Sequence, residues 1–156
     1  MSGTGFFDYG IDGVASSVAP MFLADATVDD WAAVLAHSER RRFHSGDTVI
    51  RAGDVDRSLL IIMEGDLETV AERRGKRRRL SPAPAGSVVG ELGFIDGKAR
   101  SASVIALTDG ELLRMSRSSF ESLAAVNPHL GRMVLFDLAV ILADRLRSLT
   151  EIVMAR

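Results

Sequence analysis

The sequence predicts a mainly β fold with flanking helices: an antiparallel β-roll (a double-stranded β-helix, jelly-roll-like) with an N-terminal helix and a long C-terminal helix. Three observations lead to this fold. Short apolar runs separated by turn residues fill positions 43–115. A helix-start signal precedes them near residue 27, and two helical patterns follow them from residue 116. Many short strands at close spacing are typical of antiparallel sandwiches and barrels.

The chain of 156 residues has the size of one domain with a core of its own. We expect an N-terminal extension over residues 1–26 and a domain over residues 27–156, with the roll at about 43–115 and helices at about 116–154. A net charge of −2 gives no global basicity for nucleic acid. The lack of cysteine suits a reducing compartment. No signal-peptide pattern and no membrane span are evident, so we expect a cytoplasmic protein.

The N-terminal extension is rich in Gly and Ser but also carries large apolar side chains, which favours docking on its own domain over a free tail. These side chains are Phe6, Phe7, Tyr9, Met21, Phe22 and Leu23. Thr27 and Asp30 then form a capping-box pattern, which predicts a helix start. Trp31, Val34 and Leu35 supply the apolar stripe of that short helix.

The central region predicts the strands of the roll. Its apolar runs are short and are bounded by turn dipeptides such as Gly53-Asp54, Gly65-Asp66 and Asp109-Gly110. The predicted strands are Thr48–Ile50, Leu59–Met63, Leu67–Val70, Val88–Val89, Ala102–Ala106 and Glu111–Met115.

Two helices are predicted after the roll. Residues 116–126 suit a short helix, and Asn127-Pro128 then supplies an N-cap and a favoured first position for a long helix at about 129–154. Its apolar stripe is wider than one flank of a roll requires, so either part of the helix packs on a second copy in a dimer or all of it caps the roll. The stripe contains Leu135, Leu138, Ile141, Leu142, Leu146, Leu149 and Ile152.

Residues 88–102, which we call the cassette, carry the chemistry. Glu91 is a carboxylate suited to sugar hydroxyls, and Arg100 is a guanidinium that can grip a phosphate with two parallel hydrogen bonds. Gly90 and Gly93 allow backbone to approach a ligand closely. Sugar and phosphate recognition on one loop predicts a nucleotide. The alternative is a surface hairpin with a structural Glu–Arg pair.

The order of these residues is more specific than their composition. Gly-Glu-Leu-Gly-Phe, five further residues and then Arg-Ser-Ala resembles the phosphate-binding cassette of the cyclic nucleotide-binding domain family. That family includes catabolite-activator-type transcription factors, kinase regulatory subunits and gated channels. The separation of nine between Glu91 and Arg100 is similar to the kinase and channel versions. The resemblance covers roughly residues 27–150 and implies a β-roll flanked by helices.

The resemblance also implies roles. Glu91 would accept a hydrogen bond from the ribose 2′-hydroxyl, and Arg100 would neutralise the cyclic phosphate with help from the backbone N–H groups of Leu92 and Ala102. Ser101 would touch the phosphate or the base. Residues of the preceding strand would line the base pocket. The candidate ligand-binding residues are Gly90, Glu91, Leu92, Gly93, Arg100, Ser101, Ala102, Leu80, Ser81, Val89 and Thr150.

The sequence specifies less clearly which nucleotide base such a pocket would bind. Activator-type relatives read adenine with two adjacent hydroxyl residues on the C-terminal helix, and here Leu149 replaces the first, leaving Thr150. Arg145, Arg147 or Leu149 would instead cover the base, as in kinase and channel relatives. Ser101 would also suit cyclic GMP. We expect cyclic AMP in preference to cyclic GMP, because it is the commoner bacterial ligand of the family.

Other chemistry has little support in the sequence. The basic run at residues 73–79 could contact nucleic acid, acidic lipid or an acidic partner, but such runs are usually solvated turns. His37, His44 and His129 are the only histidines, and their spacing gives no metal-ligand pair, so we expect neither a metal nor an enzyme.

We therefore expect a regulatory cyclic nucleotide-binding module that acts on an unidentified effector protein through its C-terminal helix. A homodimer through that helix is compatible with the sequence. Because the chain ends at Arg156, we expect no DNA binding by a helix-turn-helix. The alternatives are an interaction or scaffold protein with a vestigial pocket, and the regulatory domain of a transporter or channel.

Overall fold

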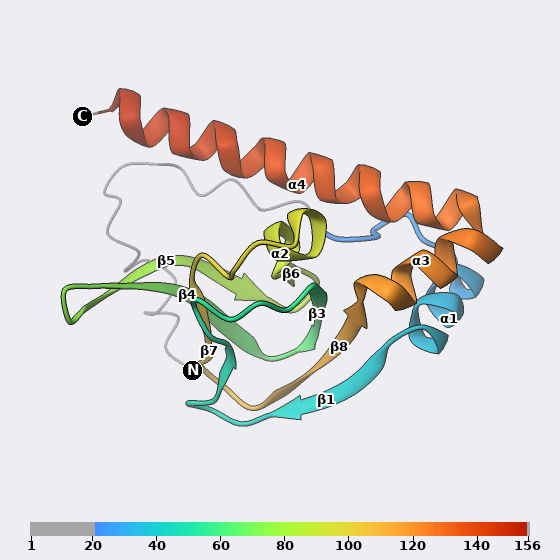
Figure 1. Cartoon of the computed structure of the whole chain (residues 1–156), viewed down its shortest axis with the longest axis horizontal. Helices are drawn as coiled ribbons and strands as arrows, with labels where there is room; N and C mark the ends of the chain where they lie inside the picture. The colour runs from blue at the N-terminus through green and yellow to red at the C-terminus, as the bar shows by residue number, and fades with distance from the viewer. Residues whose placement is uncertain (1–20, 156) are drawn as a thin grey trace.

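A computed structural model describes residues 21–155 and contains two four-stranded antiparallel sheets with helices on one side (Figure 1). The first sheet has the strand order β1-β8-β3-β6 and the second has β2-β7-β4-β5. This arrangement confirms the predicted fold class. The elements are α1 (Val28–Ala36), β1 (Glu39–Phe43), β2 (Thr48–Ile50), β3 (Ser58–Glu64), β4 (Asp66–Arg73), β5 (Lys76–Pro84), β6 (Val88–Val89), α2 (Glu91–Asp96), β7 (Ser103–Ala106), β8 (Gly110–Ser116), α3 (Arg117–Val126) and α4 (Pro128–Met154).

The helix-start signals of the sequence operate as expected. The Thr27 side chain accepts a hydrogen bond from the Asp30 N–H, and the Asp30 side chain accepts one from the Thr27 N–H, which completes a capping box at α1. Ser116 caps α3 through the Ser119 N–H. Asn127 caps α4 through the Leu130 N–H, with Pro128 as the first helical residue.

Two strands were not predicted from the sequence, and both begin with charged side chains. β1 starts with Glu39 and three arginines, and β5 starts with Lys76 and three arginines. Both strands are largely exposed and lie at sheet edges, so the apolar alternation that marks a half-buried strand is missing. The hairpin with the basic run therefore has its turn at Arg74-Gly75, while most of the run belongs to strands β4 and β5.

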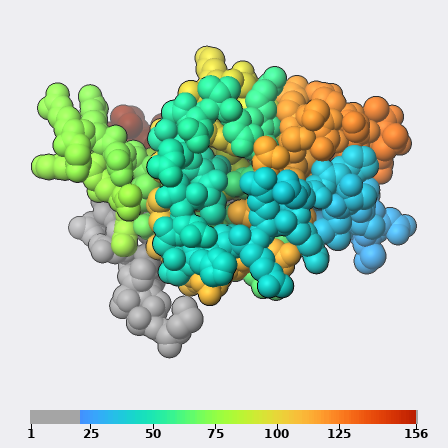
Figure 2. Space-filling model, turned by 60° about the horizontal axis from the view of Figure 1, so that its bottom comes forward, coloured from blue at the N-terminus to red at the C-terminus, as the bar shows by residue number. Residues whose placement is uncertain are grey.

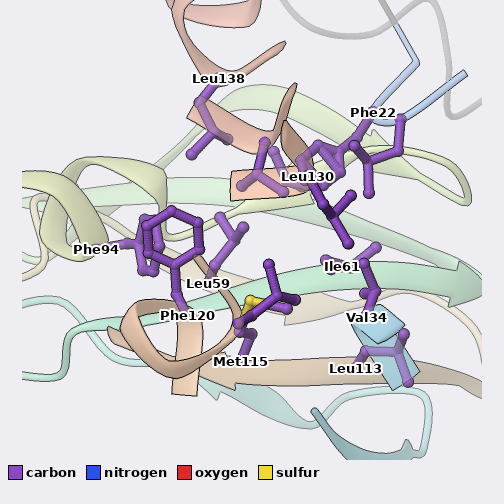
Figure 3. Close-up of a cluster of buried hydrophobic side chains, with 14 of the residues drawn as sticks. Phe22, Val34, Leu59, Ile61, Phe94, Leu113, Met115, Phe120, Leu130 and Leu138 are labelled. Atoms are coloured by element: carbon purple, nitrogen blue, oxygen red, sulfur yellow. The ribbon is translucent and has the colours of Figure 1, made fainter. Parts of the chain in front are cut away.

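The core has two parts, one on each face of the first sheet. Side chains between the two sheets form the smaller part, which includes Phe43, Leu60 and Leu112. The larger part lies between the first sheet and the helices, where Leu59, Ile61, Leu113 and Met115 of β3 and β8 meet the helical side chains (Figure 3). The helical partners include Val34, Phe94, Phe120, Leu123, Leu130, Val134 and Leu138.

The end of the N-terminal extension docks on the domain, as expected for Phe22 and Leu23, which are both buried in the larger core. The Phe22 N–H donates to the Gly86 carbonyl at 3.0 Å, and the Leu23 N–H donates to the Asp137 carboxylate at 2.8 Å. These two bonds tie the turn before β6 to the first half of α4. Met21 is exposed, and the expectation for Phe6, Phe7 and Tyr9 lies outside the described residues.

Helix α4 is packed along its first half only. Its buried residues end at Ile141, and beyond that point large apolar side chains such as Leu146, Leu149 and Val153 are exposed. In Figure 1 the helix runs across the top of the molecule over α2 and β6. No helix among residues 21–155 is long and apolar enough to cross a membrane.

This division of α4 predicts a difference between two leucine truncations. Leu130→Ala leaves a cavity at a fully buried site and should lower the free energy of unfolding by about 2–5 kcal/mol. Leu146→Ala, at a side chain 66% exposed, should change it by less than about 0.5 kcal/mol. Urea unfolding followed by circular dichroism measures both. Equal losses would contradict the assignment of Leu130 to the core.

Candidate functional site

The cassette is built around the short helix α2, which joins β6 to β7. Gly90 precedes the helix with φ +79° and Gly97 ends it with φ +72°, a backbone region that side chains with a Cβ rarely adopt. Phe94 is fully buried and makes an edge contact with Phe120 of α3, with ring centroids 5.4 Å apart. The Arg117 guanidinium donates to the Phe94 carbonyl at 3.0 Å. Helix α2 is thereby fixed to α3.

Arg100 lies beneath the first turn of α2 and is only 7% exposed. Its Nη1 donates to the Gly90 carbonyl and its Nη2 to the Ser58 carbonyl, each at 2.7 Å. Its Nε is buried and has no hydrogen-bond partner among the described residues. A Cβ on Gly90 or on Gly93 would lie 2.8 Å from Arg100 Nη1, so both glycines make room for the guanidinium.

The backbone of Arg100 is held as firmly as its side chain. Its N–H donates to the Asp54 carbonyl at 2.8 Å, and its carbonyl accepts from the Gly53 N–H at 2.9 Å. The turn between β2 and β3 therefore sets where the arginine enters the cassette. Burial lowers the pKa of Arg100, while the charge of Asp56 raises it and that of Arg114 lowers it further.

Asp56 organises the polar groups beside Arg100. It accepts from the Ser58 N–H at 3.0 Å and pairs with Arg114 at 3.3 Å. Burial alone would raise the pKa of Asp56, but hydrogen bonding from Ser58 and the charges of Arg114 and Arg100 outweigh this and hold the pKa below its ordinary value.

Glu91 is 6% exposed and is paired with Arg145 of α4. The Arg145 guanidinium also donates to the Val88 carbonyl at 3.2 Å, so one side chain of α4 contacts both sides of the cassette turn. Burial lowers the pKa of Arg145. This contact occurs just beyond Ile141, where apolar packing of the helix has ended.

The structure brings together some of the predicted site residues but not all. Glu91 and Arg100 are buried under or beside α2, and Leu92 is exposed on it. Thr150 is exposed, and its hydroxyl donates to the Leu146 carbonyl of its own helix at 2.9 Å. Val89 is buried in the core between the sheets. Of the remaining candidates, Leu80 and Ser81 lie on β5, and Ser101 and Ala102 end the cassette immediately before β7.

Three residues of the site were missed by sequence reasoning: Asp56, Ser58 and Arg114. They come from the start of β3 and from β8, far from the cassette in sequence. Nothing in the local sequence marks them, because their role depends on the position of Arg100 in the folded chain. The sequence indicated Arg145 only as a cover for the base. Its pairing with Glu91 could be recognised only in the folded chain.

A family model described as the cyclic nucleotide-binding domain matches residues 40–127. The chain belongs to the cyclic nucleotide-binding domain family. This confirms the resemblance drawn from the cassette. The sequence is 31% identical over 133 residues to the cyclic AMP receptor protein of Thermus thermophilus, covering 83% of this chain and 58% of that protein. It is 33% identical over 119 residues to the cAMP-activated global transcriptional regulator CRP of Escherichia coli, covering 75% of this chain and 55% of the relative.

Solved structures of the family agree with the fold. The Thermus thermophilus catabolite activator protein superposes with a TM-score of 0.73 and 27% identity, over 83% of this chain and 59% of that one. A cyclic nucleotide-binding domain from Methylobacillus flagellatus gives a TM-score of 0.74 and 25% identity, over 81% and 71% of the two chains. The chain thus spans somewhat more than half the length of the curated relatives it matches.

The lowered pKa of Asp56 predicts how stability depends on pH. An aspartate with a lowered pKa in the folded state stabilises that state above its unfolded value of about 4, and this contribution is lost as pH falls through the folded pKa. Asp56→Asn should therefore be less stable than wild type at pH 7, and the gap should close progressively below about pH 4.

Urea unfolding at a series of pH values measures this gap. Asp25→Asn, at an exposed position outside this cluster, is the control and should follow the wild-type profile. A gap between Asp56→Asn and wild type that stays constant down to about pH 3 would contradict the role given to the ionised carboxylate.

Proposed function

We propose that the chain is a regulatory cyclic nucleotide-binding module, with its domain over residues 27–156, that prefers cyclic AMP to cyclic GMP and signals through α4. The observation that carries this proposal is the placement of a buried carboxylate, Glu91, and a buried guanidinium, Arg100, in one glycine-rich cassette. A cyclic 3′,5′-nucleotide keeps its ribose 2′-hydroxyl free for the first group and offers an anionic phosphate to the second.

Arg100 is suited to the phosphate. Its guanidinium donates to two backbone carbonyls. Its Nε–H has no acceptor among the described residues and is therefore available to a phosphate oxygen. Neutral carbonyls are weaker acceptors for a guanidinium than a phosphate, because charge-assisted bonds are roughly twice as strong. A phosphate that enters beside α2 therefore gains an anchored cation, with the backbone N–H groups of Leu92 and Ala102 as further donors.

Glu91 connects the ribose to α4. Its carboxylate pairs with Arg145 of α4. When a ribose hydroxyl donates to Glu91, it competes with the guanidinium for the same oxygens. Because Arg145 is the contact by which the second half of α4 reaches the cassette, ligand binding shifts the population of α4 positions.

The base would lie against the second sheet. Leu80 is 43% exposed on β5, and Ser81 pairs with Thr69 of β4, so this strand would offer an apolar and a polar side chain to the base. Preference for cyclic AMP is supported by the curated relatives, whose names describe a cyclic AMP receptor and a cAMP-activated regulator. Ser101 is exposed next to Arg100 and is the residue that would also admit cyclic GMP.

The output surface is the apolar face of α4. A second copy, as a homodimer, or an effector protein would cover this face and register the movement of the helix. Its exposed large apolar side chains are Leu135, Phe136, Val140, Leu146, Leu149, Val153 and Met154.

The second candidate function is an interaction or scaffold protein with a vestigial pocket. The pairing of Glu91 with Arg145 favours it, because a guanidinium of the same chain then takes up the carboxylate. In that case the pair is a structural link and no cyclic nucleotide binds.

Calorimetry separates these candidates. We expect cyclic AMP to bind wild type more tightly than cyclic GMP, with cyclic di-GMP as a third titrant. Arg100→Ala should lose about 2–5 kcal/mol of binding free energy, because the phosphate would then face no buried cation. Arg40→Ala, on β1 with its guanidinium 69% exposed, is the matched control and should bind like wild type.

Since Arg100 also supports α2, Arg100→Lys is measured beside Arg100→Ala. Lys keeps the charge but loses the paired donors, so we expect it to fold and to bind between wild type and Arg100→Ala. If folded wild-type protein binds none of the three nucleotides at about 1 mM, the sensor function is refuted and the vestigial-pocket function is supported.

Hydrogen exchange tests the role of α4. In Arg145→Ala the amides of residues 142–154 should exchange faster than in wild type, because the contact with Glu91 and Val88 is lost. Arg147→Ala, exposed on the same helix, should leave exchange unchanged. Identical exchange in the two variants would refute Arg145 as the contact that holds this half.

A further inference from the structure

A polar cleft of about 520 Å³ opens between the edges of the two sheets, on the side of β1 and β2. It is separate from the cassette surface that faces α4, since neither Glu91 nor Arg145 lines it. Figure 2 shows the face of the molecule on which β1, β2 and the loop before β3 lie, in cyan and teal. The charged residues of the cleft are Arg41, Arg42, Arg51, Arg100, Arg114, Asp47, Asp54 and Asp56.

The strand register explains why arginines enter the cleft. Arg41 lies opposite Leu112, and Arg114 lies opposite Leu60, in antiparallel pairs. Directly opposite residues share a face of the sheet. Both leucines belong to the core between the sheets, so the two arginines occupy the same inner face at the point where the second sheet no longer covers it.

The charges in the cleft favour an anion. Five arginines and three aspartates line it, an excess of two positive charges. Within the part of the chain that the structure describes, neither Arg42 nor Arg51 has a carboxylate within 4.0 Å. Arg41 pairs with Glu39 only at an exposed position, and such pairs contribute little to stability. Of these arginines, Arg41 and Arg51 have guanidinium groups available to a ligand, whereas Arg42, the neighbour of Arg41 on β1, points to the other face of the sheet.

Arg100 closes the inner end of the cleft. It is the same side chain that supports α2, and its buried Nε has no partner among the described residues. Asp56 also lines the cleft. Its carboxylate interacts electrostatically with the guanidinium of Arg100 and forms an ion pair with Arg114. A ligand that binds Arg114 would thus change the charges around Arg100.

We propose that this cleft binds a small anion with two or more phosphate or carboxylate groups, at a site separate from the cyclic nucleotide pocket. Several guanidinium forks around one cavity match a multivalent oxyanion, because each fork can donate two parallel hydrogen bonds. Coupling between the two sites through Arg100 rests on the proposed function; anion binding to the cleft does not.

Calorimetry with inorganic pyrophosphate and with citrate, each at fixed ionic strength, tests the proposal and separates phosphate from carboxylate ligands. We expect at least one of them to bind wild type and to bind the double variant R41A/R51A about tenfold or more weakly. The double variant R74A/R78A removes the same charge from the β4–β5 hairpin and should bind within about twofold of wild type. All four side chains are exposed, so the variants should fold.

A second titration is made in saturating cyclic AMP. Pyrophosphate or citrate should still bind, with a changed affinity if the two sites are coupled. Displacement by cyclic AMP together with unchanged binding in R41A/R51A would assign the anion to the nucleotide pocket and overturn the proposal. Loss in R74A/R78A alone would assign it to the hairpin, and no binding at about 10 mM would also overturn it. If cyclic AMP itself does not bind, only the proposed function fails.

Discussion

The buried guanidinium of Arg100 is the interaction on which the arrangement of this domain depends. It links the start of β3 to the turn before α2 through the Ser58 and Gly90 carbonyls. A charge in such a position is costly unless it is paired and hydrogen-bonded, so the surrounding chain must supply acceptors and space. Asp56 provides the opposite charge nearby, and Gly90 and Gly93 provide the space. The glycines, the loop before β3 and the placement of α2 all follow from this one requirement.

Helix α4 combines two kinds of attachment. Up to Ile141 it is held by apolar packing and by the Leu23 N–H on Asp137, which are insensitive to a ligand in the cassette. Beyond Ile141 it is held to the cassette through Arg145, which contacts the very carboxylate that a ribose would use. The two kinds of attachment thus meet close to the proposed site, where α2 is linked to α3 by Phe94 and Arg117.

Much of this architecture could be predicted from the sequence, because its signals are local. The capping residues Thr27 and Asn127 marked two helix starts, and the order of residues in the cassette identified the family. Strands β1 and β5 escaped prediction because arginines replace the apolar alternation. The Ser58 partner of Arg100 and the Arg145 partner of Glu91 escaped it for another reason: they come from segments more than forty residues away, and only the folded chain brings them together.

Strand β5 has a consequence for how these molecules behave in a concentrated solution. It is the last strand of its sheet, and β4 is its only partner among the described residues, so its outer backbone groups offer a template for a strand of another chain. Its first half is crowded with cations, and its second half contains Pro82 and Pro84, which lack an N–H to donate. If two copies met through this edge, their cationic side chains would repel one another. The prolines would also leave the backbone hydrogen-bond ladder between the two strands incomplete. The run of arginines therefore also opposes association of two chains through this edge.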